Sequence, residues 1–378
     1  MLKKILFLTG TRADFGKLKP LMRAVDHDDQ YECCIFVTGM HTLSRYGYTV
    51  EEVYKAGFSN IHTFMNQIHG EPMDLILANT IGGLSRFVNE YKPDLIVVHG
   101  DRVEALAGAI VGSLNNILVA HIEGGEISGT IDELIRHSAS KLSHIHFVAN
   151  KEAADRLEQL GESPESIYSI GSPDIDVMLS PDLPNLQDVK EYYEIPFDEY
   201  GVVLFHPVTT EKDYIEQYAN TLVTALVKSH KNYIVIYPNN DEGSSDIFKA
   251  YEKIRYNTRF KIYPSIRFEY FLTLLKHSEF IIGNSSVGMR EAPVYGVPSI
   301  NIGTRQNNRF QYSSIINVKT NVQDILHAIH NVQYAPPSKP CYSFGTGKST
   351  ELFIQALKEE RLWETPKQKQ FRDLVLKR

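Results

Sequence analysis

The stretch from Leu95 to His137 constrains the fold most, because it holds two short apolar runs separated by a helical pattern. Leu95–Val98 and Ile117–Ala120 are each four residues long, rich in β-branched side chains and bounded by Gly, Pro or Asn. Such runs are typical of strands buried on both faces of a parallel sheet. Val103–Leu114, rich in Ala and other small residues, fits the crossover helix between them.

Acidic residues follow both predicted strands. Because parallel strands end at the same edge of a sheet, we expect Asp101 and Glu123 at the carboxyl ends of neighbouring or near-neighbouring strands, where ligands of open α/β sheets bind. Asp132 and Glu133 open the next helix. Like charges held close raise one another's pKa, which suits acid and base chemistry. The sequence therefore predicts catalytic carboxylates at this edge.

Each acid also has a purely structural interpretation. Asp101 stands in a Gly-Asp-Arg turn and could simply pair with Arg102. Thr130–Glu133 matches a capping box, in which Glu133 would only reach back to the start of its helix. Four carboxylates at one edge, without histidines at metal-ligand spacing, are harder to explain in structural terms.

Composition bounds the class of protein. With 378 residues, 43% hydrophobic and 22% charged, the chain is an ordinary globular protein with room for two domains of about 150 to 200 residues each. Its net charge of −7 argues against a nucleic-acid-binding surface, although a local basic pocket for phosphates remains open. Three cysteines give neither a disulfide framework nor zinc spacing, so a reducing cytoplasm is expected. We find no signal peptide, membrane span or anchor in the sequence.

Strands and helices alternate along the chain, which predicts a doubly wound α/β architecture in each half. We place an N-terminal domain at 1–172, a C-terminal domain at 173–360 and a tail helix at 361–378 that packs back across both. The proline-rich segment 171–184 suggests the crossing between the domains. No residue-level repeat is present, but the repeated architecture predicts two similar domains that face a cleft.

Two turns carry candidate phosphate-binding groups. The strand Ile5–Leu8 runs through a glycine-containing turn into a helix, and Arg12 in that turn is placed either to contact a diphosphate or to be a solvated turn arginine. Phe280–Ile282 leads into Ser285 and Ser286, which open a predicted helix whose free N–H groups favour a phosphate, unless the serines only cap it.

Other residues of the second half also follow strands. His206 comes where a strand stops, and Pro207 favours an extended backbone before it; a plain core or surface histidine is the alternative. Glu291 is placed to reach ribose hydroxyls, and a kink or early stop is expected at Pro293 within the same helix. Arg305 follows a further strand and brings a guanidinium group to the same edge.

One apparent motif is set aside. Gly345–Ser349 looks like the end of a Walker A loop, but Tyr342 stands where the earlier glycine is required and no hydrophobic strand precedes it. We interpret this segment as the start of a helix over about Ser349–Arg361.

At the candidate site residues and in the segments around them, the chain resembles the hydrolysing UDP-N-acetylglucosamine 2-epimerases of bacterial sialic acid biosynthesis. The resemblance spans about residues 3 to 350 and rests on ordered blocks: Thr9–Lys17, HGDR at 99–102, HIEGGEISGTID at 121–132, IRH at 135–137, FHPVTTE at 205–211, YPNND at 237–241, GNSS at 283–286, REAPVYGVP at 290–298 and GTRQ at 303–306. Non-hydrolysing relatives carry Arg-rich residues where this chain has Pro207–Thr210, which favours the hydrolytic branch. The family commonly has Asp-Asp where Asp132-Glu133 stands here.

The resemblance implies a glycosyltransferase-B-like fold of two Rossmann-type domains, with the nucleotide held mainly by the second. It implies conversion of UDP-N-acetylglucosamine and water to N-acetylmannosamine and UDP, without a metal or other cofactor, in a homodimer or homotetramer. The matching catalytic positions are Asp101, Glu123, Asp132 and His206, with Glu133 a further candidate. The matching UDP-binding positions are Arg12, Arg102, Asn239, Ser285, Ser286, Glu291 and Arg305.

Three alternatives remain open at this stage. The same reaction on a UDP- or GDP-linked 2,4-diacetamido-trideoxy sugar, as in legionaminic acid synthesis, would use the same residues. A retaining glycosyltransferase would share the fold but needs an acceptor sugar and no acid cluster. A non-catalytic nucleotide-sugar sensor would bind the substrate without turnover.

Overall fold

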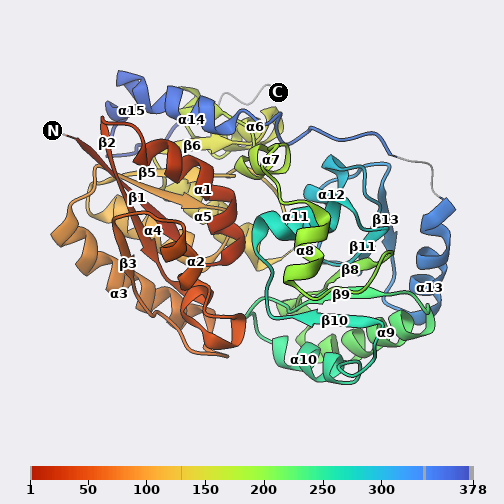
Figure 1. Cartoon of the computed structure of the whole chain (residues 1–378). Coiled ribbons are helices and arrows are strands. Elements are labelled where there is room, and N and C mark those ends of the chain that lie inside the picture. The colour runs from red at the N-terminus through yellow and green to blue at the C-terminus, as the bar shows by residue number, and fades with distance from the viewer. Residues whose placement is uncertain (1, 129, 335–337, 374–378) are drawn as a thin grey trace. The chain divides into compact units, whose positions relative to one another are not determined.

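The computed structural model describes residues 2–128, 130–334 and 338–373, and the chain forms two compact units (Figure 1). Unit 1 consists of Met1–Glu126, Asp132–Ser180 and Ser343–Arg378, as far as these ranges are described. Unit 2 consists of Ile127–Ile131 and Pro181–Tyr342, within the same limits. Among the described residues, no helix combines the length and the apolar character needed to cross a membrane.

Unit 1 is built on a seven-stranded sheet whose order is β3-β2-β1-β4-β5-β6-β7 and whose paired strands are all parallel. The order reverses direction between β1 and β4, which is the topological switch point of a doubly wound sheet. The strands are β1 (Lys3–Thr9), β2 (Tyr31–Val37), β3 (Ile61–Thr63), β4 (Leu95–His99), β5 (Leu118–Ile122), β6 (Ile145–Val148) and β7 (Ile167–Ser169).

Helices cover both faces of this sheet because its strands are apolar on both sides. Ile5 and Phe7 of β1 belong to a core shared with α1, α2 and α14, whereas Leu6 and Leu8 belong to a second core shared with α3, α4 and α5. Each fully buried side chain of this size contributes roughly 1.5–3 kcal/mol. The helices of unit 1 are α1 (Arg12–Asp26), α2 (Val50–Lys55), α3 (Met73–Tyr91), α4 (Val103–Leu114), α5 (Ile131–Leu142), α6 (Lys151–Gln159), α7 (Pro173–Met178), α14 (Ser349–Lys358) and α15 (Glu360–Trp363).

The segment after Tyr342 returns to unit 1, which corrects the expected domain boundaries at 172 and 360. The physical reason is the apolar face of α14: Phe353 is fully buried between Phe7 and Phe147, with ring centroids 6.3 and 4.9 Å away. Removing such a side chain typically costs 3–5 kcal/mol, so this packing fixes the return. Ser349 is the first residue of α14, so the interpretation of the Walker-like segment as a helix start is confirmed.

The expected tail helix over 361–378 is also corrected. Helix α15 ends at Trp363, and Pro366 disfavours helix at the residue before it. The described residues beyond it follow an irregular path over unit 1, whereas 374–378 lie outside the described residues. Lys369 donates to the carbonyl oxygens of Lys141 and Ser143 at 2.7 and 2.6 Å.

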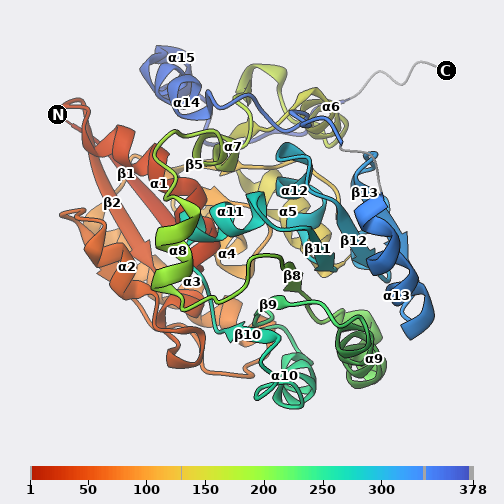
Figure 2. The ribbon, with the colours of Figure 1, turned by 45° about the vertical axis from the view of Figure 1, so that its right-hand side comes forward.

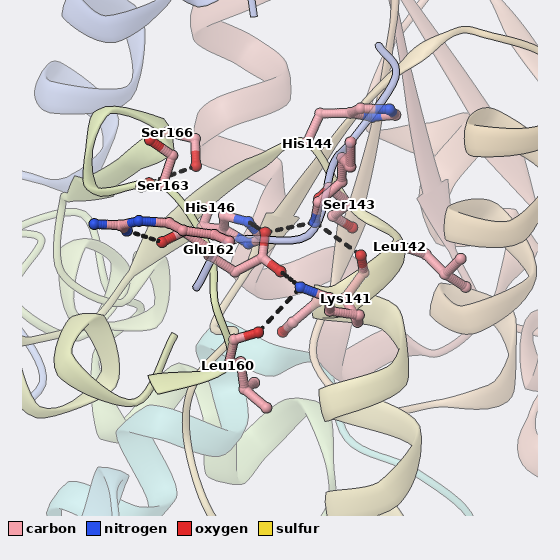
Figure 3. Close-up of polar contacts among 12 residues, drawn as sticks. Lys141, Leu142, Ser143, His144, His146, Leu160, Glu162, Ser163 and Ser166 are labelled. Carbon is pink, nitrogen blue, oxygen red and sulfur yellow. Dashed lines mark hydrogen bonds and ion pairs between the residues drawn. The ribbon is translucent and has the colours of Figure 1, made fainter. Parts of the chain in front are cut away.

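The irregular segment after α15 contacts Glu162, a buried acid of unit 1. Glu162 accepts hydrogen bonds from Lys141 Nζ at 2.9 Å and from Lys369 Nζ, and it lies 3.0 Å from His146 Nε2 (Figure 3). Arg372 donates to the Glu162 carbonyl at 2.7 Å. Because these groups come from α5, β6 and the tail, one carboxylate holds three parts of the chain together.

Unit 2 repeats the architecture with a six-stranded sheet, order β10-β9-β8-β11-β12-β13, again with only parallel pairings. Its switch point lies between β8 and β11. The strands are β8 (Gly201–Leu204), β9 (Tyr233–Ile236), β10 (Phe260–Tyr263), β11 (Phe280–Gly283), β12 (Ser299–Ile302) and β13 (Ile315–Val318).

Helices of unit 2 lie on both sides of its sheet (Figure 2). One hydrophobic core packs α9, α10 and α13 against β8, β9 and β12, and α11 packs with α8. These helices are α8 (Leu186–Tyr192), α9 (Ile215–Lys228), α10 (Ser244–Glu252), α11 (Phe268–Lys276), α12 (Glu291–Val294) and α13 (Val322–Asn331). Two parallel sheets with helical layers confirm the expected α/β class.

Candidate functional site

The carboxyl edge of the unit 1 sheet carries the predicted acids. Asp101 follows β4 and Glu123 follows β5, and these strands pair directly, with His99 opposite Ile122. Glu123 is 4% exposed and Asp101 is partly buried. The structure therefore places both acids at the ends of neighbouring strands, as the apolar runs predicted.

A buried arginine links the two acids. Arg136 of α5 is 1% exposed; its Nη2 donates to the Asp101 carboxylate and its Nη1 donates to the Glu123 carbonyl at 2.7 Å. The same Nη1 lies 3.6 Å from Glu126 Oε2. Bonds from one planar guanidinium to two loops fix their geometry as well as their charge. Arg136 was not predicted as a site residue, because its partners lie in other strands and loops.

Glu123 has an unusual backbone. Its φ of 63° lies in the left-handed region, which residues other than glycine seldom adopt, and Gly125 follows with φ 76°. Such conformations cluster at functional sites, where the surrounding structure holds them. The Glu123 carboxylate accepts a hydrogen bond from the Ser172 hydroxyl and lies 3.3 Å from His99 Nε2.

The two acids of α5 differ in their surroundings. Asp132 and Glu133 both lie in the first turn of the helix and are partly buried. Glu133 lies 3.5 Å from His137 Nε2 in an i,i+4 pair. Asp132 and Glu133 stand four and three residues before Arg136, so helix geometry places both on the side of α5 that carries this arginine. Arg136 is the residue that contacts Asp101 and Glu123, so both acids stay candidates for the third acid.

His121, which was not predicted as a site residue, connects the turn that carries Asp101 to helix α5. It is fully buried in β5, with Nε2 2.7 Å from the Gly100 carbonyl and Nδ1 2.9 Å from Ser140 Oγ. Burial lowers the pKa of His121 to about 3, so the ring is neutral. The neutral ring then donates from Nε2 to Gly100, next to Asp101, and accepts the Ser140 hydroxyl at Nδ1.

The predicted UDP-binding arginines of unit 1 both have carboxylate partners. Arg12 opens α1, where Thr11 and Asp14 form a capping box, and its Nη2 lies 2.7 Å from Glu52 Oε1. Arg102 precedes α4, and its Nε lies 3.3 Å from Glu104 Oε2. Arg102 therefore contacts Glu104, while the Asp101 carboxylate accepts from Arg136.

The unit 2 residues gather at its switch point around Asn284, which is 2% exposed. The Asn284 side chain accepts from the His206 N–H at 2.7 Å and donates to the His206 carbonyl at 2.8 Å. The Asn284 carbonyl accepts from Arg305 Nη1 at 3.3 Å and from Gln306 Nε2 at 2.8 Å. Asn284 therefore ties together the ends of β8, β11 and β12, a role that only the three-dimensional structure reveals.

The backbone of Asn239 fixes the state of His206. The Asn239 N–H donates to His206 Nδ1 at 3.1 Å, so Nδ1 is an acceptor and the proton of the neutral ring lies on Nε2. The Asn239 side chain meanwhile donates to Asp241. His206 thus presents an N–H donor on its outer nitrogen, which suits contact with a phosphate oxygen.

The expected long helix after Ser285 is corrected by the structure. Ser285 caps a short 3-10 turn (Ser286–Gly288), with Val287 N–H donating to its hydroxyl at 3.4 Å, and α12 starts separately at Glu291. Glu291 is 2% exposed. Helix α12 ends at Val294, directly after Pro293, which agrees with the expected early stop. A phosphate at Ser285 would therefore meet backbone N–H groups without the dipole of a long helix.

No metal site accompanies these residues. Within the described ranges, no group of three or more His, Cys, Asp or Glu side chains is arranged to hold a metal ion. The unit 1 edge offers acid–base groups, and the unit 2 edge offers hydrogen-bond donors.

Comparison with known proteins gives one consistent family. The family model described as UDP-N-acetylglucosamine 2-epimerase matches residues 23–358. A UDP-N-acetylglucosamine 2-epimerase of Neisseria meningitidis is 50% identical over 99% of this chain and 100% of its own length. A hydrolysing UDP-N,N'-diacetylbacillosamine 2-epimerase of Legionella pneumophila is 31% identical, covering 95% of this chain and 96% of its own.

A solved structure agrees on the fold. The Methanocaldococcus jannaschii UDP-GlcNAc 2-epimerase, crystallised with UDP-GlcNAc and UDP, superposes with a TM-score of 0.80. It is 23% identical and covers 94% of this chain and 99% of its own.

Proposed function

Because the chain belongs to the UDP-N-acetylglucosamine 2-epimerase family, we propose that it converts UDP-N-acetylglucosamine and water to N-acetylmannosamine and UDP. This is the enzymatic reaction expected from the sequence, and it serves sialic acid synthesis. The observation that carries it is the 50% identity, end to end, with the Neisseria epimerase. The pairing of Asp101 and Glu123 through Arg136 supports it from the side of the chemistry.

The first chemical step is an elimination. The C2 proton of the sugar is barely acidic, so its removal needs a carboxylate in line and a departing diphosphate whose charge is stabilised. A carboxylate takes the C2 proton, the electron pair forms the C1–C2 double bond, and the C1–O bond to UDP breaks. We assign proton removal and later water activation to Asp101 and Glu123.

The second step is hydration of the resulting 2-acetamidoglucal. Water adds to C1 while a protonated acid delivers a proton to C2 from the opposite face, which inverts C2. We assign the delivery to Asp132, which shares a helix face with Arg136. Glu133 is the further candidate.

The departing diphosphate is assigned to groups of both units. His206, with its proton on Nε2, contacts the leaving phosphate. Arg12, Arg102, Arg305 and the backbone around Ser285 and Ser286 supply charge and N–H donors. Asn239 and Glu291 are assigned to the nucleoside.

The sugar and the base are the finer part of the proposal. The identity to the Neisseria enzyme exceeds that to the Legionella enzyme by 19 percentage points (50 against 31), which favours N-acetylglucosamine over the diacetamido sugar. Turnover of both sugars, each on UDP and on GDP, tests this directly. We also propose a homodimer or homotetramer, measurable by light scattering on the purified protein, and a cytoplasmic location.

The deciding experiment is turnover in deuterated water with the sugar nucleotide as sole substrate. The wild type should release free N-acetylmannosamine with deuterium at C2, and Asp101→Asn should not. Asp155→Asn, a surface acid paired with Lys151, is the matched control and should behave as wild type. A glycosyltransferase would release little free amino sugar, and a sensor would bind without turnover. Activity that survives Asp101→Asn would remove that residue from its role.

A further inference from the structure

Ser172 has the sequence position of a helix cap but does not act as one. It is the N-cap of α7, directly before Pro173, where a serine normally accepts from the free N–H groups of the first turn. Here the side chain makes no cap hydrogen bond. The hydroxyl, fully buried, instead donates to Oε1 of Glu123, 49 positions earlier in the chain.

We propose that Ser172 is a positioning residue of the epimerase reaction, which orients the Glu123 carboxylate and keeps it ionised through this hydrogen bond. Glu123 sits on a left-handed backbone, so its side chain is aimed by its contacts and not by a regular strand. A donor on Oε1 fixes the rotation of the carboxylate and leaves Oε2 beside His99, at 3.3 Å.

The Walker-like segment Gly345–Ser349 and the residue before it help to position Ser172. The Ser172 N–H donates to the Phe344 carbonyl at 2.7 Å, which pins the residue to the returning chain. Gly345 has φ 144°, and a Cβ there would lie 3.1 Å from Ser172 N and 3.2 Å from Gly171 Cα. Only a glycine lets the two backbones approach so closely. The backbone of Phe344 and Gly345 therefore packs against the backbone of Ser172 and holds it in place.

The far end of α7 holds the same segment. Asp176 accepts the N–H groups of Ser349 and Thr350, at 2.9 and 2.7 Å, and so caps the start of α14. Lys17 of α1 lies 2.9 Å from the buried Asp174. Because both ends of α7 are anchored, the Ser172 hydroxyl has a fixed direction toward Glu123.

Several titratable or charged groups lie around Glu123, and Ser172 differs from all of them because its side chain does not titrate. His99 of β4 lies beside Oε2, and Arg136 of α5 donates to the Glu123 backbone carbonyl. The carboxylates of Asp101 and Glu126 contact the same arginine. Ser172 is a neutral donor, and a hydrogen bond to the charged form of an acid favours that form. Losing it should make Glu123 easier to protonate.

The inference rests on the proposed function, so the wild type is assayed first. If the wild type releases N-acetylmannosamine, kcat, KM and the pH profile are then compared for wild type, Ser172→Cys and Ser172→Ala. Because the alanine variant loses a hydrogen bond to a charged group, we expect its kcat to fall by about 10- to 100-fold. Its KM should change less than about threefold. The acid limb of the profile should move to higher pH by about one unit, since one unit corresponds to a tenfold change.

The cysteine variant keeps the shape of the side chain with a weaker donor, so its kcat should fall between the other two. Ser143→Ala is the matched control, because Ser143 is equally buried and its hydroxyl donates to the Ala139 carbonyl at 2.8 Å. It should lower stability without moving the acid limb. The inference is overturned if Ser172→Ala keeps the wild-type kcat and acid limb, or if Ser143→Ala changes both equally. An inactive wild type would instead refute the proposed function.

Discussion

Two buried acids of unit 1, Glu162 and Glu123, differ in the charge of the groups around their carboxylates. Glu162, 2% exposed, has Lys141, Lys369 and His146 around its carboxylate. Glu123, 4% exposed, has a serine hydroxyl and a histidine there, and the nearby Arg136 bonds its carbonyl instead. A carboxylate ringed by cations is locked in its charged form, whereas one held by a neutral donor can still exchange a proton. Burial is common to both acids, so the charge of their partners is what separates the candidate catalytic acid Glu123 from the structural acid Glu162.

The largest effect should come from Arg136→Met. This change removes the cation that joins Asp101 to Glu123, and we expect kcat to fall more than about 100-fold, as for loss of a preorganised electrostatic contact. The free energy of unfolding should fall by about 3 kcal/mol, because a buried partner of an ion pair is lost. Arg86→Met, an exposed arginine of α3, is the control for both measurements. A variant within threefold of the wild-type kcat would contradict the role of Arg136.

Next in size is Glu162→Gln, which should separate stability from activity. Removing the charge leaves Lys141 and Lys369 without their counter-ion, so the free energy of unfolding should drop by about 2–4 kcal/mol in urea titrations. At temperatures where the variant is folded, kcat should stay within about twofold of wild type. If kcat fell as far as in the Arg136 variant, the contrast between the two acids would collapse.

The pH dependence sharpens the same comparison. Burial would raise the Glu162 pKa, but the hydrogen bonds and charges of His146 and Lys369 outweigh it and lower that pKa from 4.5 to about 2. A depressed acid stabilises the fold above its unfolded value and loses that contribution as pH falls through its folded value. The stability gap between wild type and Glu162→Gln should therefore be full above about pH 5 and shrink toward pH 2. A gap that is constant with pH would show that the charge of Glu162 does not matter.

His146 also makes the folded state less stable as the pH falls, through its own titration. Burial lowers its pKa, against the opposing influence of Glu162, so the folded state holds the ring neutral more readily than the unfolded state does. Its contribution is present above the ordinary histidine range and declines as pH falls below it. Acid unfolding curves of the wild type should thus begin to fall before Glu162 itself titrates.

The smallest effect should be that of Lys369→Met. Lys141 and His146 remain on Glu162, so only about 1 kcal/mol of stability should be lost. Cleavage by trypsin within 364–373 should become faster, because Lys369 anchors this irregular segment. Lys151→Ala removes an exposed i,i+4 pair with Asp155 and should change neither readout. Equal effects of the two lysine changes would show that Lys369 stabilises the fold no more than an exposed surface lysine does.

Local sequence patterns predicted what depends on neighbouring residues. The runs around Leu95 and Leu118 were readable as parallel strands, and with them the positions of Asp101 and Glu123. Helix α4 was predicted with its observed bounds, because Val103–Leu114 is rich in Ala and other small residues between two apolar runs. Strand β3, with three residues, and β13, with partly exposed ones, were missed, since neither forms a clear apolar run.

What could not be predicted depends on contacts between distant segments. Arg136, His121 and Asn284 acquire their roles from partners in other strands and loops, and no spacing in the chain indicates those partners. The return of the chain after Tyr342 depends on Phe353 finding Phe7 and Phe147. A serine such as Ser172, which looks like an ordinary cap, is the clearest case of local chemistry overruled by tertiary structure.

The assembly of unit 1 from both sides of unit 2 affects how the protein is made. On the ribosome, residues 181–342 leave the exit tunnel before α14 does, so unit 2 can begin to fold while unit 1 still lacks part of its core. Until then Phe7 and Phe147 expose an apolar surface to the cell. A premature stop codon after unit 2 would therefore damage the half of the enzyme that was synthesised first.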